Sequence, residues 1–445
     1  KTFLIKQVFK NRITFQHTGV SPVDQDGEKN LMKTQLESFY YDLLSYGLEG
    51  CSKPTSWMEA FFLLKQLLIK LDNGSRQVIF LDELPWMDTP RSGFLPAFES
   101  FWNGWCSGRD NIMLIVCGSA TSWILGNLSR NKGGLYGRLT DEIKLSPFTL
   151  KECEEYFAHE NIVMSRYDIL QSYMVFGGIP YYLSYFKKGL SLTANIDNIL
   201  FGKNPRLNDE LNRLFNAIFT NPEDCKKIIS LLAKRHIGYT REEISEETNI
   251  PFGGGLTNTL NALIESDFVQ KYNPYNTHGK VVRYKLIDNF CLFWLKYVDE
   301  NVHKSDFMTE NISSEILKSW RGVAFEELCW QHINPIKRAL GISGISSSLS
   351  AWNVKGDDNK EGVQIDLLIS RNDNVVNLCE MKFAGDTYTI DKDEDAKLRN
   401  RIETLKQTLS AKQSVHLTMI TTFGITYGKY SGIVQKEVTM DDLFE

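Results

Sequence analysis

Residues 78–86 read VIFLDELPW, and this stretch decides the fold class. Its first four residues are apolar and predict a buried β-strand, after which Asp82 and Glu83 emerge at the carboxyl end. In open α/β sheets, ligands bind at that end of the strands. We expect Asp82 to hold the water shell of a metal ion and Glu83 to orient or deprotonate a water molecule. The alternative is a solvated acidic loop that follows a core strand.

A second apolar strand, NIMLIVCGSA, is predicted at residues 111–120, and amphipathic helical patterns separate it from the first. Apolar strands that alternate with helices predict an α/β fold with a parallel sheet covered on both faces. Gly118 and Ser119 end this strand at the same sheet edge as the two acids. Arg138 follows in a segment that we expect to precede another strand. An NTPase needs cations and polar groups of this kind around a γ-phosphate.

The sequence begins with Lys1 and Thr2, which head a stretch of helical spacing. A P-loop ends in G-K-[ST] at the point where a strand leads into a helix. Lys1 would then reach the β- and γ-phosphates of ATP, and Thr2 would hold Mg²⁺. The strand and glycine-rich loop that come first in a P-loop are not in the sequence. We therefore expect the sequence to begin inside the motif and, in this form, to bind ATP poorly, because the N–H groups around the phosphates are missing.

Residues 207–300 differ in pattern, since three short helical stretches precede two alternating strands. This is the element order of a winged helix-turn-helix, and we expect residues 225–287 to form a compact three-helix unit with a two-stranded wing. The alternative is an internal packing module. The candidate contacts to nucleic acid are glycines 253–255, where the backbone could approach a partner, Thr257, Asn258 and Asn261 on the third helix, and His278, Lys280 and Arg283 in the wing.

A hairpin is predicted at residues 363–383, with its turn near residue 372. Folding at this turn would bring Asp366 roughly opposite Glu380. Glu380 and Lys382 are two residues apart and therefore share one strand face. We expect the three side chains to converge, so that the two acids bind Mg²⁺ and the lysine positions or activates a water molecule. The alternative is a solvated hairpin with a surface ion pair.

Four stretches of the chain together resemble a known family. They read FLDELPWMDTPRSGFLPAFESFWNGW, NIMLIVCGSATSWI, GGLYGRLTDEIKLSPFTLKECEEYF and FGGIPYYL. They resemble the archaeal-type AAA+/STAND P-loop ATPases that are common in archaea and in Bacteroides-like bacteria, and the resemblance covers nearly the whole chain. It implies an α/β ATPase core with a parallel sheet at residues 1–150, a helical lid at 151–206, a winged helix at 207–300 and an α/β PD-(D/E)xK nuclease-like domain at 312–445.

The same resemblance assigns roles to individual residues and implies ATP and Mg²⁺ as cofactors. The nucleotide set comprises Lys1 and Thr2 of Walker A, Asp82 and Glu83 of Walker B, Ser119 as sensor 1 and Arg138 as the arginine that senses the γ-phosphate. The nuclease set comprises Asp366, Glu380 and Lys382 of the D…E-x-K pattern, and Glu326, which matches the extra acid that such nucleases carry on their first helix.

Composition excludes some classes of function. Of the 445 residues, 42% are hydrophobic and 24% are charged, and no apolar run reaches the roughly 18 residues of a membrane span. The net charge of −5 argues against a uniformly basic nucleic-acid coat but leaves room for a local basic site. The eight cysteines form no C-x-x-C pair and the seven histidines are isolated, which favours reduced thiols in a cytoplasmic protein over a zinc site. Serine-rich residues 343–350 are predicted to form a short loop.

Two functions are compatible with these patterns. In the first, the protein is an ATP-dependent enzyme that acts on DNA and cuts it with its last domain. In the second, ATP occupancy changes the arrangement of the domains, and the winged helix and an inactive nuclease-like domain only bind DNA or a protein partner. A second copy of the chain is a further candidate partner, and no membrane contact is expected.

Overall fold

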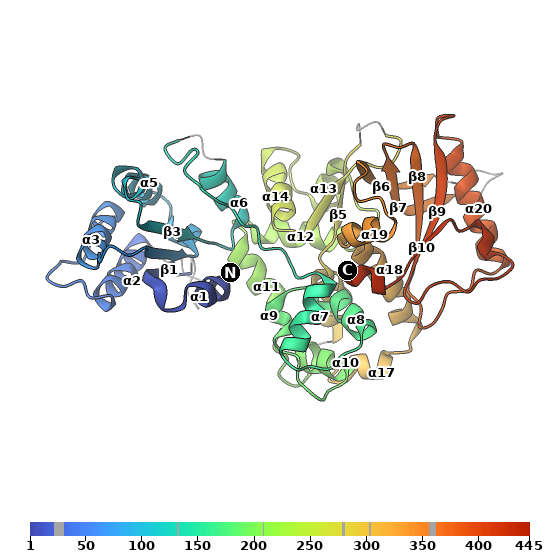
Figure 1. The fold of residues 1–445 in the computed structure, drawn as a ribbon, viewed down its shortest axis with the longest axis horizontal. Coiled ribbons are helices and arrows are strands. Elements are labelled where there is room, and N and C mark those ends of the chain that lie inside the picture. Colours follow the sequence, from blue (N-terminus) through green and yellow to red (C-terminus); the bar gives the residue numbers. More distant parts are fainter. Residues whose placement is uncertain are drawn as a thin grey trace. The chain divides into compact units, whose positions relative to one another are not determined.

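The structure, a computed structural model, describes residues 1–21, 31–130, 133–207, 209–277, 281–301, 304–354, 356 and 362–445. These residues form two units (Figure 1). Unit 1 comprises Lys1–Leu145 and Arg213–Pro222, and unit 2 comprises Ser146–Asn212 and Glu223–Glu445. The predicted division into four domains stays a prediction. The predicted wing residues His278 and Lys280 lie outside the described residues.

A three-stranded parallel sheet forms the centre of unit 1, in the order β1-β2-β3. The strands are β1 (Ile13–Thr18), β2 (Gln77–Asp82) and β3 (Ile112–Val116). All six residues of β2 are buried, as expected for a strand with a neighbour on each side. The register pairs Thr18 with Asp82 and Leu81 with Val116, so the carboxyl ends of the three strands meet at one edge.

Helices α2, α3 and α5 pack together with this sheet and supply most of its core (Figure 1). Phe39, Phe61 and Phe94, one from each helix, pack in a single apolar cluster with Phe15 and Leu81 of the strands. Regular segments of unit 1 outside the sheet are α1 (Thr2–Phe9), η1 (Lys10–Arg12), α2 (Met32–Ser45), α3 (Trp57–Lys70), α4 (Leu84–Met87), α5 (Phe94–Gly104), η2 (Cys106–Gly108), α6 (Thr121–Ile124) and η3 (Leu125–Ser129), while α11 (Glu210–Ile218) has residues in both units.

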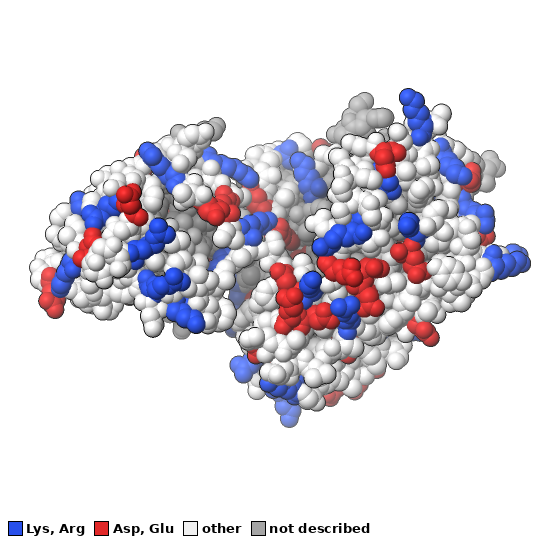
Figure 2. Space-filling view, in the orientation of Figure 1, with Lys and Arg blue, Asp and Glu red and all other residues white. Residues whose placement is uncertain are grey.

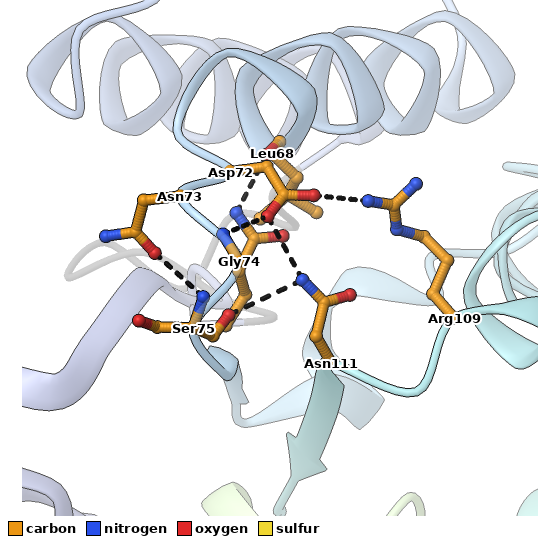
Figure 3. Close-up of polar contacts among 8 residues, drawn as sticks. Leu68, Asp72, Asn73, Gly74, Ser75, Arg109 and Asn111 are labelled. Carbon is orange, nitrogen blue, oxygen red and sulfur yellow. Dashed lines mark hydrogen bonds and ion pairs between the residues drawn. The ribbon is translucent and has the colours of Figure 1, made fainter.

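Polar contacts hold the loop that leads into β2 (Figure 3). Asp72 accepts the N–H of Gly74 at 3.0 Å and the side-chain amide of Asn111 at 3.1 Å, and it pairs with Arg109. The N–H of Gly74 and the charge of Arg109 lower the pKa of Asp72 despite some desolvation. Because this network lies at the amino ends of β2 and β3, it anchors the strands at the end opposite to Asp82.

The strand predicted after Arg138 is absent from the part of unit 1 that the structure describes. Residues 138–149 contain neither helix nor strand, and Ile143 remains 74% exposed. The prediction was wrong because an apolar segment becomes a strand only where a neighbouring strand offers hydrogen-bond partners, and this segment does not reach the sheet.

In unit 2, three helices and an antiparallel strand pair follow one another in the order that the sequence predicts for residues 225–287. The helices are α12 (Pro222–Leu232), α13 (Arg241–Thr248) and α14 (Gly254–Glu265), and the strands are β4 (Val269–Tyr272) and β5 (Arg283–Leu286). The helices around this group are α7 (Leu150–His159), α8 (Arg166–Phe176), α9 (Pro180–Leu183), α10 (Leu192–Ile196), η4 (Asp197–Phe201), α15 (Asn289–Phe293), η5 (Trp294–Val298), α16 (Asp299–Asn301) and α17 (Phe307–Asn311). None of the helices in the described ranges is both long and apolar enough to cross a bilayer.

A five-stranded mixed sheet completes unit 2, in the order β10-β9-β8-β7-β6. Its elements are α18 (Glu315–Gln331), α19 (Ile333–Ala339), β6 (Ser347–Val354), β7 (Val363–Arg371), β8 (Val375–Lys382), α20 (Lys392–Lys406), β9 (Ser414–Thr421), η6 (Ser431–Ile433), β10 (Lys436–Val438) and η7 (Asp441–Phe444). Helices α18 and α20 lie on opposite sides of the sheet (Figure 1). Strand β6 overlaps residues 343–350, which were wrongly predicted to be only a loop. The antiparallel partner β7 imposes the extended conformation there, against the weak strand preference of a serine-rich stretch.

A buried ion pair fastens the β4–β5 hairpin to α18. The Lys285 Nζ atom lies 2.8 Å from the Glu327 Oε2 atom, and both side chains are at most 5% exposed. The same ammonium group lies 4.1 Å from the ring centre of Trp330, and the N–H of Tyr275 donates to the carbonyl of Ala351 in β6 at 2.9 Å. The hairpin is therefore part of the same packed body as the C-terminal sheet.

Lys285→Ala should lower the free energy of unfolding by about 3–5 kcal/mol, because Glu327 would be left buried without a cation. Urea denaturation followed by tryptophan fluorescence measures this loss. Lys285→Met combined with Glu327→Leu should recover most of it, since neither charge then remains. As a control, Lys318→Ala removes an exposed pair with Glu315 and should cost no more than about 0.5 kcal/mol. Equal losses for Lys285→Ala and the control would contradict the role assigned to the buried pair.

Candidate functional site

The Asp82 carboxylate lies at the centre of a polar cluster at the carboxyl end of β2. Asp82 is 3% exposed, and two side chains donate to it: the Thr2 hydroxyl to Oδ2 at 2.5 Å and the Cys117 thiol to Oδ1. Burial, together with the neighbouring Asp82 carboxylate, raises the pKa of the Cys117 thiol to about 12, so this thiol stays a protonated donor. Side chains from helix α1 and from the segment after β3 therefore both donate hydrogen bonds to the same buried carboxylate.

Glu83 is held against the end of β3 by Ser119. One oxygen of Glu83 accepts both the N–H of Ser119 at 2.9 Å and its hydroxyl at 2.8 Å. The backbone of Glu83 has φ = +47°, a left-handed conformation that residues other than glycine rarely adopt. Such strained positions gather at functional sites. This turn ends β2 and directs the Glu83 side chain toward the end of the neighbouring strand β3.

Lys1 joins the same edge, since its Nζ atom donates to the carbonyl of Gly118 at 2.6 Å. The structure thus brings together five of the six residues predicted for a nucleotide site, namely Lys1, Thr2, Asp82, Glu83 and Ser119. Arg138, the sixth, lies in an exposed turn, and none of the contacts seen among the described residues joins its side chain to this edge.

The chemistry of this cluster suits a polyphosphate and Mg²⁺. It combines a lysine cation, a hydroxyl beside a buried carboxylate, and a second carboxylate oriented by hydrogen bonds. Carboxylate and hydroxyl oxygens are ligands that Mg²⁺ accepts, and in such sites the ion usually keeps waters and phosphate oxygens as well. The hydroxyl of Thr2 and the carboxylate of Asp82 fit that arrangement as two oxygen ligands. In the described ranges, no three His, Cys, Asp or Glu side chains gather closely enough to hold a metal unaided.

The C-terminal hairpin turns where the sequence predicts, but its strand β7 contains one extra residue. Leu367 pairs with Cys379 on β8, as a turn near residue 372 requires. Between its pairs with Ser350 and Trp352 of β6, strand β7 takes three steps, from Leu368 to Ile365, while β6 takes two. This mismatch is a β-bulge that includes Asp366.

The predicted nuclease residues Asp366 and Glu380 make different contacts. Glu380 lies on the α20 face, where it pairs with Arg401 of that helix. Ile365 belongs to the apolar core on the α20 face, and the Gln364 side chain donates to Asp366 at 2.6 Å. None of the contacts seen among the described residues joins Asp366 to Glu380 or Lys382, and the expected convergence of the three side chains stays a prediction.

Glu326 of α18 lies near Asp366 and is a poor carboxylate ligand in its present surroundings. Burial raises the pKa of Glu326 to about 9, and the negative charges of Asp366, Glu327 and Glu380 add to this effect. Near neutral pH the group is therefore a protonated acid. Of the predicted metal ligands Glu326, Asp366 and Glu380, Glu326 is therefore neutral, and the charges of the other two act on it.

The predicted nucleic-acid contacts in α14 and the wing are only partly exposed. Asn258 and Asn261 face solvent, and Thr257 is half-buried, with its hydroxyl donating to the carbonyl of Gly253 at 3.2 Å. Arg283 is engaged inside the unit, since it donates to the carbonyl of Gly238 at 2.9 Å and lies 3.6 Å from Glu243. This wing residue is therefore committed to holding its own unit together.

Three residues that shape these sites were not found from the sequence. Cys117 sits at the end of an apolar strand, where a thiol is normally read as core. Lys285 looked like an ordinary strand lysine. The third residue, Arg401, could have been found from the sequence, because it follows Glu394 by seven residues and therefore lies on the same face of the predicted helix.

No family model matches the sequence. The chain is 25% identical over 303 residues to the uncharacterised protein MJECL04 of Methanocaldococcus jannaschii, a match that covers 67% of this chain and 65% of that relative's length. Among solved structures, the Walker-type ATPase PABY2304 of Pyrococcus abyssi aligns with a TM-score of 0.42 and 15% identity, over 66% of this chain and 87% of that one. At this TM-score the likeness alone does not decide the fold.

The stability of the protein should fall as the pH rises from about 5 to about 9, in part because of Glu326. Its folded pKa of about 9 lies above the ordinary value, so the folded state holds a proton that the unfolded state has lost across this window. Glu326→Gln should therefore gain stability over the parent as the pH rises, measured by urea denaturation at pH 5 and pH 8.5. Glu315→Gln, an exposed position on the same helix, is the control. A difference between Glu326→Gln and the parent that does not change with pH would contradict this assignment.

Proposed function

We propose that the protein binds and hydrolyses ATP with Mg²⁺ as a P-loop ATPase of the AAA+/STAND type, and that it works as a switch. The observation that carries this proposal is the pairing of Thr2 with the buried Asp82 carboxylate beside the Glu83–Ser119 pair. A hydroxyl and a carboxylate in contact provide two oxygen ligands for the ion or its water shell. ATP supplies the phosphoryl group, and the residues around it position it and a water molecule.

Each residue of the cluster has a role that follows from its contacts. Lys1 balances the negative charge of phosphate oxygens, and Thr2 and Asp82 hold Mg²⁺ directly or through water. Glu83 takes a proton from the attacking water. Ser119 donates two hydrogen bonds to one oxygen of Glu83, so it leaves the other oxygen to accept that proton. A phosphate-sensing role for Arg138 rests on the family resemblance alone.

For unit 2 we propose a protein partner. Helices α13 and α14 and the short segments around them, residues 241–267, carry one arginine and six acids, a net charge of −5. DNA binding depends on basic side chains that neutralise phosphates, so this surface repels a duplex. Figure 2 shows mixed charges on one face of the molecule and acidic side chains gathered over α7 and η7. A partner with a basic surface matches this distribution.

Action on DNA is the second candidate, favoured by the order of three helices and a strand pair, which is that of a winged helix. The charges of α13 and α14 and the burial of Lys285 in the hairpin weigh against it. The two candidates differ in what unit 2 binds and share the same nucleotide site.

Glu83→Gln should still bind ATP and Mg²⁺ but hydrolyse ATP about 10²–10⁴-fold more slowly, because the amide keeps the hydrogen bond from Ser119 and cannot accept a proton. The measurement is best made on a form of the protein in which a strand and a glycine-rich loop precede Lys1. Nucleotide affinity and phosphate release are followed separately. Glu37→Gln, a carboxylate of α2 that pairs with Lys53, is the control and should hydrolyse at the parent rate. Parent-like hydrolysis by Glu83→Gln would show that Glu83 is not the base.

The chain should not bind duplex DNA measurably at physiological salt, as followed by fluorescence anisotropy of a labelled duplex. Replacing Glu242, Glu246 and Glu247 by lysine should create salt-dependent binding, because all three are exposed and their reversal makes the α13 surface basic. Tight, salt-sensitive binding by the unchanged chain would favour the DNA candidate instead.

A further inference from the structure

Four charged side chains form a closed cluster on the α20 face of the C-terminal sheet. We call Glu380, Lys382, Glu394 and Arg401 the Glu380 cluster. The Arg401 Nη1 atom donates to one oxygen of Glu380 at 2.5 Å, and the Lys382 Nζ atom lies 2.9 Å from the other oxygen and 3.0 Å from Glu394. The four side chains are between 11% and 28% exposed, so solvent screens them little. Two acids and two bases leave the cluster without net charge.

A divalent ion does not fit this arrangement. Both oxygens of Glu380 already face a cation of the protein, and an added ion would lie beside the ammonium and guanidinium groups. Burial works to lower the pKa of Lys382, but Glu380 and Glu394 outweigh it and hold the pKa above its usual value, so the lysine keeps its charge. Asp366, the second acid predicted for a nuclease site, has no contact with this cluster among those seen in the described residues.

We propose that Arg401 is the resident cation of the Glu380 carboxylate, where the sequence predicted Mg²⁺, and that this part of the chain binds no metal. The cluster then serves to hold α20 against β8. The C-terminal domain consequently works without metal-dependent cleavage. This inference does not rest on the nucleotide site of unit 1 and stands or falls independently of it.

The position of Arg401 favours this role over that of a surface residue. Glu394 and Arg401 are one heptad apart on α20, and they bracket Glu380 and Lys382 of β8. A guanidinium group can donate to a carboxylate oxygen and still keep donors for solvent, so it satisfies a buried acid near the surface at small cost. Removing it leaves two acids and one base in a poorly solvated place, which makes the cluster negative and open to another cation.

The test is Mn²⁺ binding without nucleotide, followed by electron paramagnetic resonance of the free ion and by thermal denaturation. The unchanged chain should show no Mn²⁺ site that depends on Glu380, so that Glu380→Gln leaves Mn²⁺ binding as it was. Arg401→Gln should lower the melting temperature and gain Mn²⁺ affinity by about tenfold or more, since one neighbouring positive charge is gone. Added Mn²⁺ should then restore part of the lost melting temperature.

Further variants decide the outcome if Arg401→Gln folds poorly. Arg401→Lys keeps a cation and should remain insensitive to Mn²⁺, while Arg401→Gln combined with Glu380→Gln should lose any gained affinity. Lys406→Gln, which removes an exposed pair with Glu403 on the same helix, should behave like the unchanged chain. A Mn²⁺ site in the unchanged chain that Glu380→Gln or Asp366→Asn abolishes would overturn the proposal. Equal Mn²⁺ affinity in Arg401→Gln and Arg401→Lys would overturn it as well.

Discussion

The burial of β2 between two parallel neighbours is the constraint on which the candidate site of unit 1 depends. A strand hydrogen-bonded on both sides and covered on both faces can place polar side chains only at its ends. Asp82 stands at such an end and is itself buried, so its carboxylate must be satisfied by protein donors. Thr2 and Cys117 supply them, and they tie α1 and the end of β3 to the same point. Glu83 adopts a left-handed backbone conformation at the end of β2, which is a local strain that accompanies this geometry.

Unit 2 uses charged residues in a different way. Its buried charges are paired with one another, Lys285 with Glu327 on the α18 side and Glu380 with Lys382 and Arg401 on the α20 side. Paired buried charges contribute little net stability and penalise strongly any arrangement that separates them. They therefore favour one packing of the hairpin and the sheet.

Much of the secondary structure was accessible from the sequence, because the apolar periodicities are strong and the turns carry clear signals. The strands of unit 1, the three helices before the β4–β5 hairpin and the turn near residue 372 all follow from patterns of a few residues. Two errors have one cause. Residues 138–149 were predicted to form a strand and do not, whereas Ser347–Val354 form a strand where mostly loop was predicted. In both cases the outcome depends on whether a neighbouring strand completes the backbone hydrogen bonds.

The sequence by itself determined which residues carry chemistry at the ends of strands, since an apolar run followed by Asp82 and Glu83 can bury only the run. It also determined that Glu380 and Lys382 share a face, since two residues is the period of a strand. Only the tertiary structure decided which of these groups meet. Strand β7 carries a bulge that includes Asp366, and the packing of α20 brought Arg401 to Glu380. Such contacts depend on register and on helix position, which long-range packing sets and local pattern does not encode.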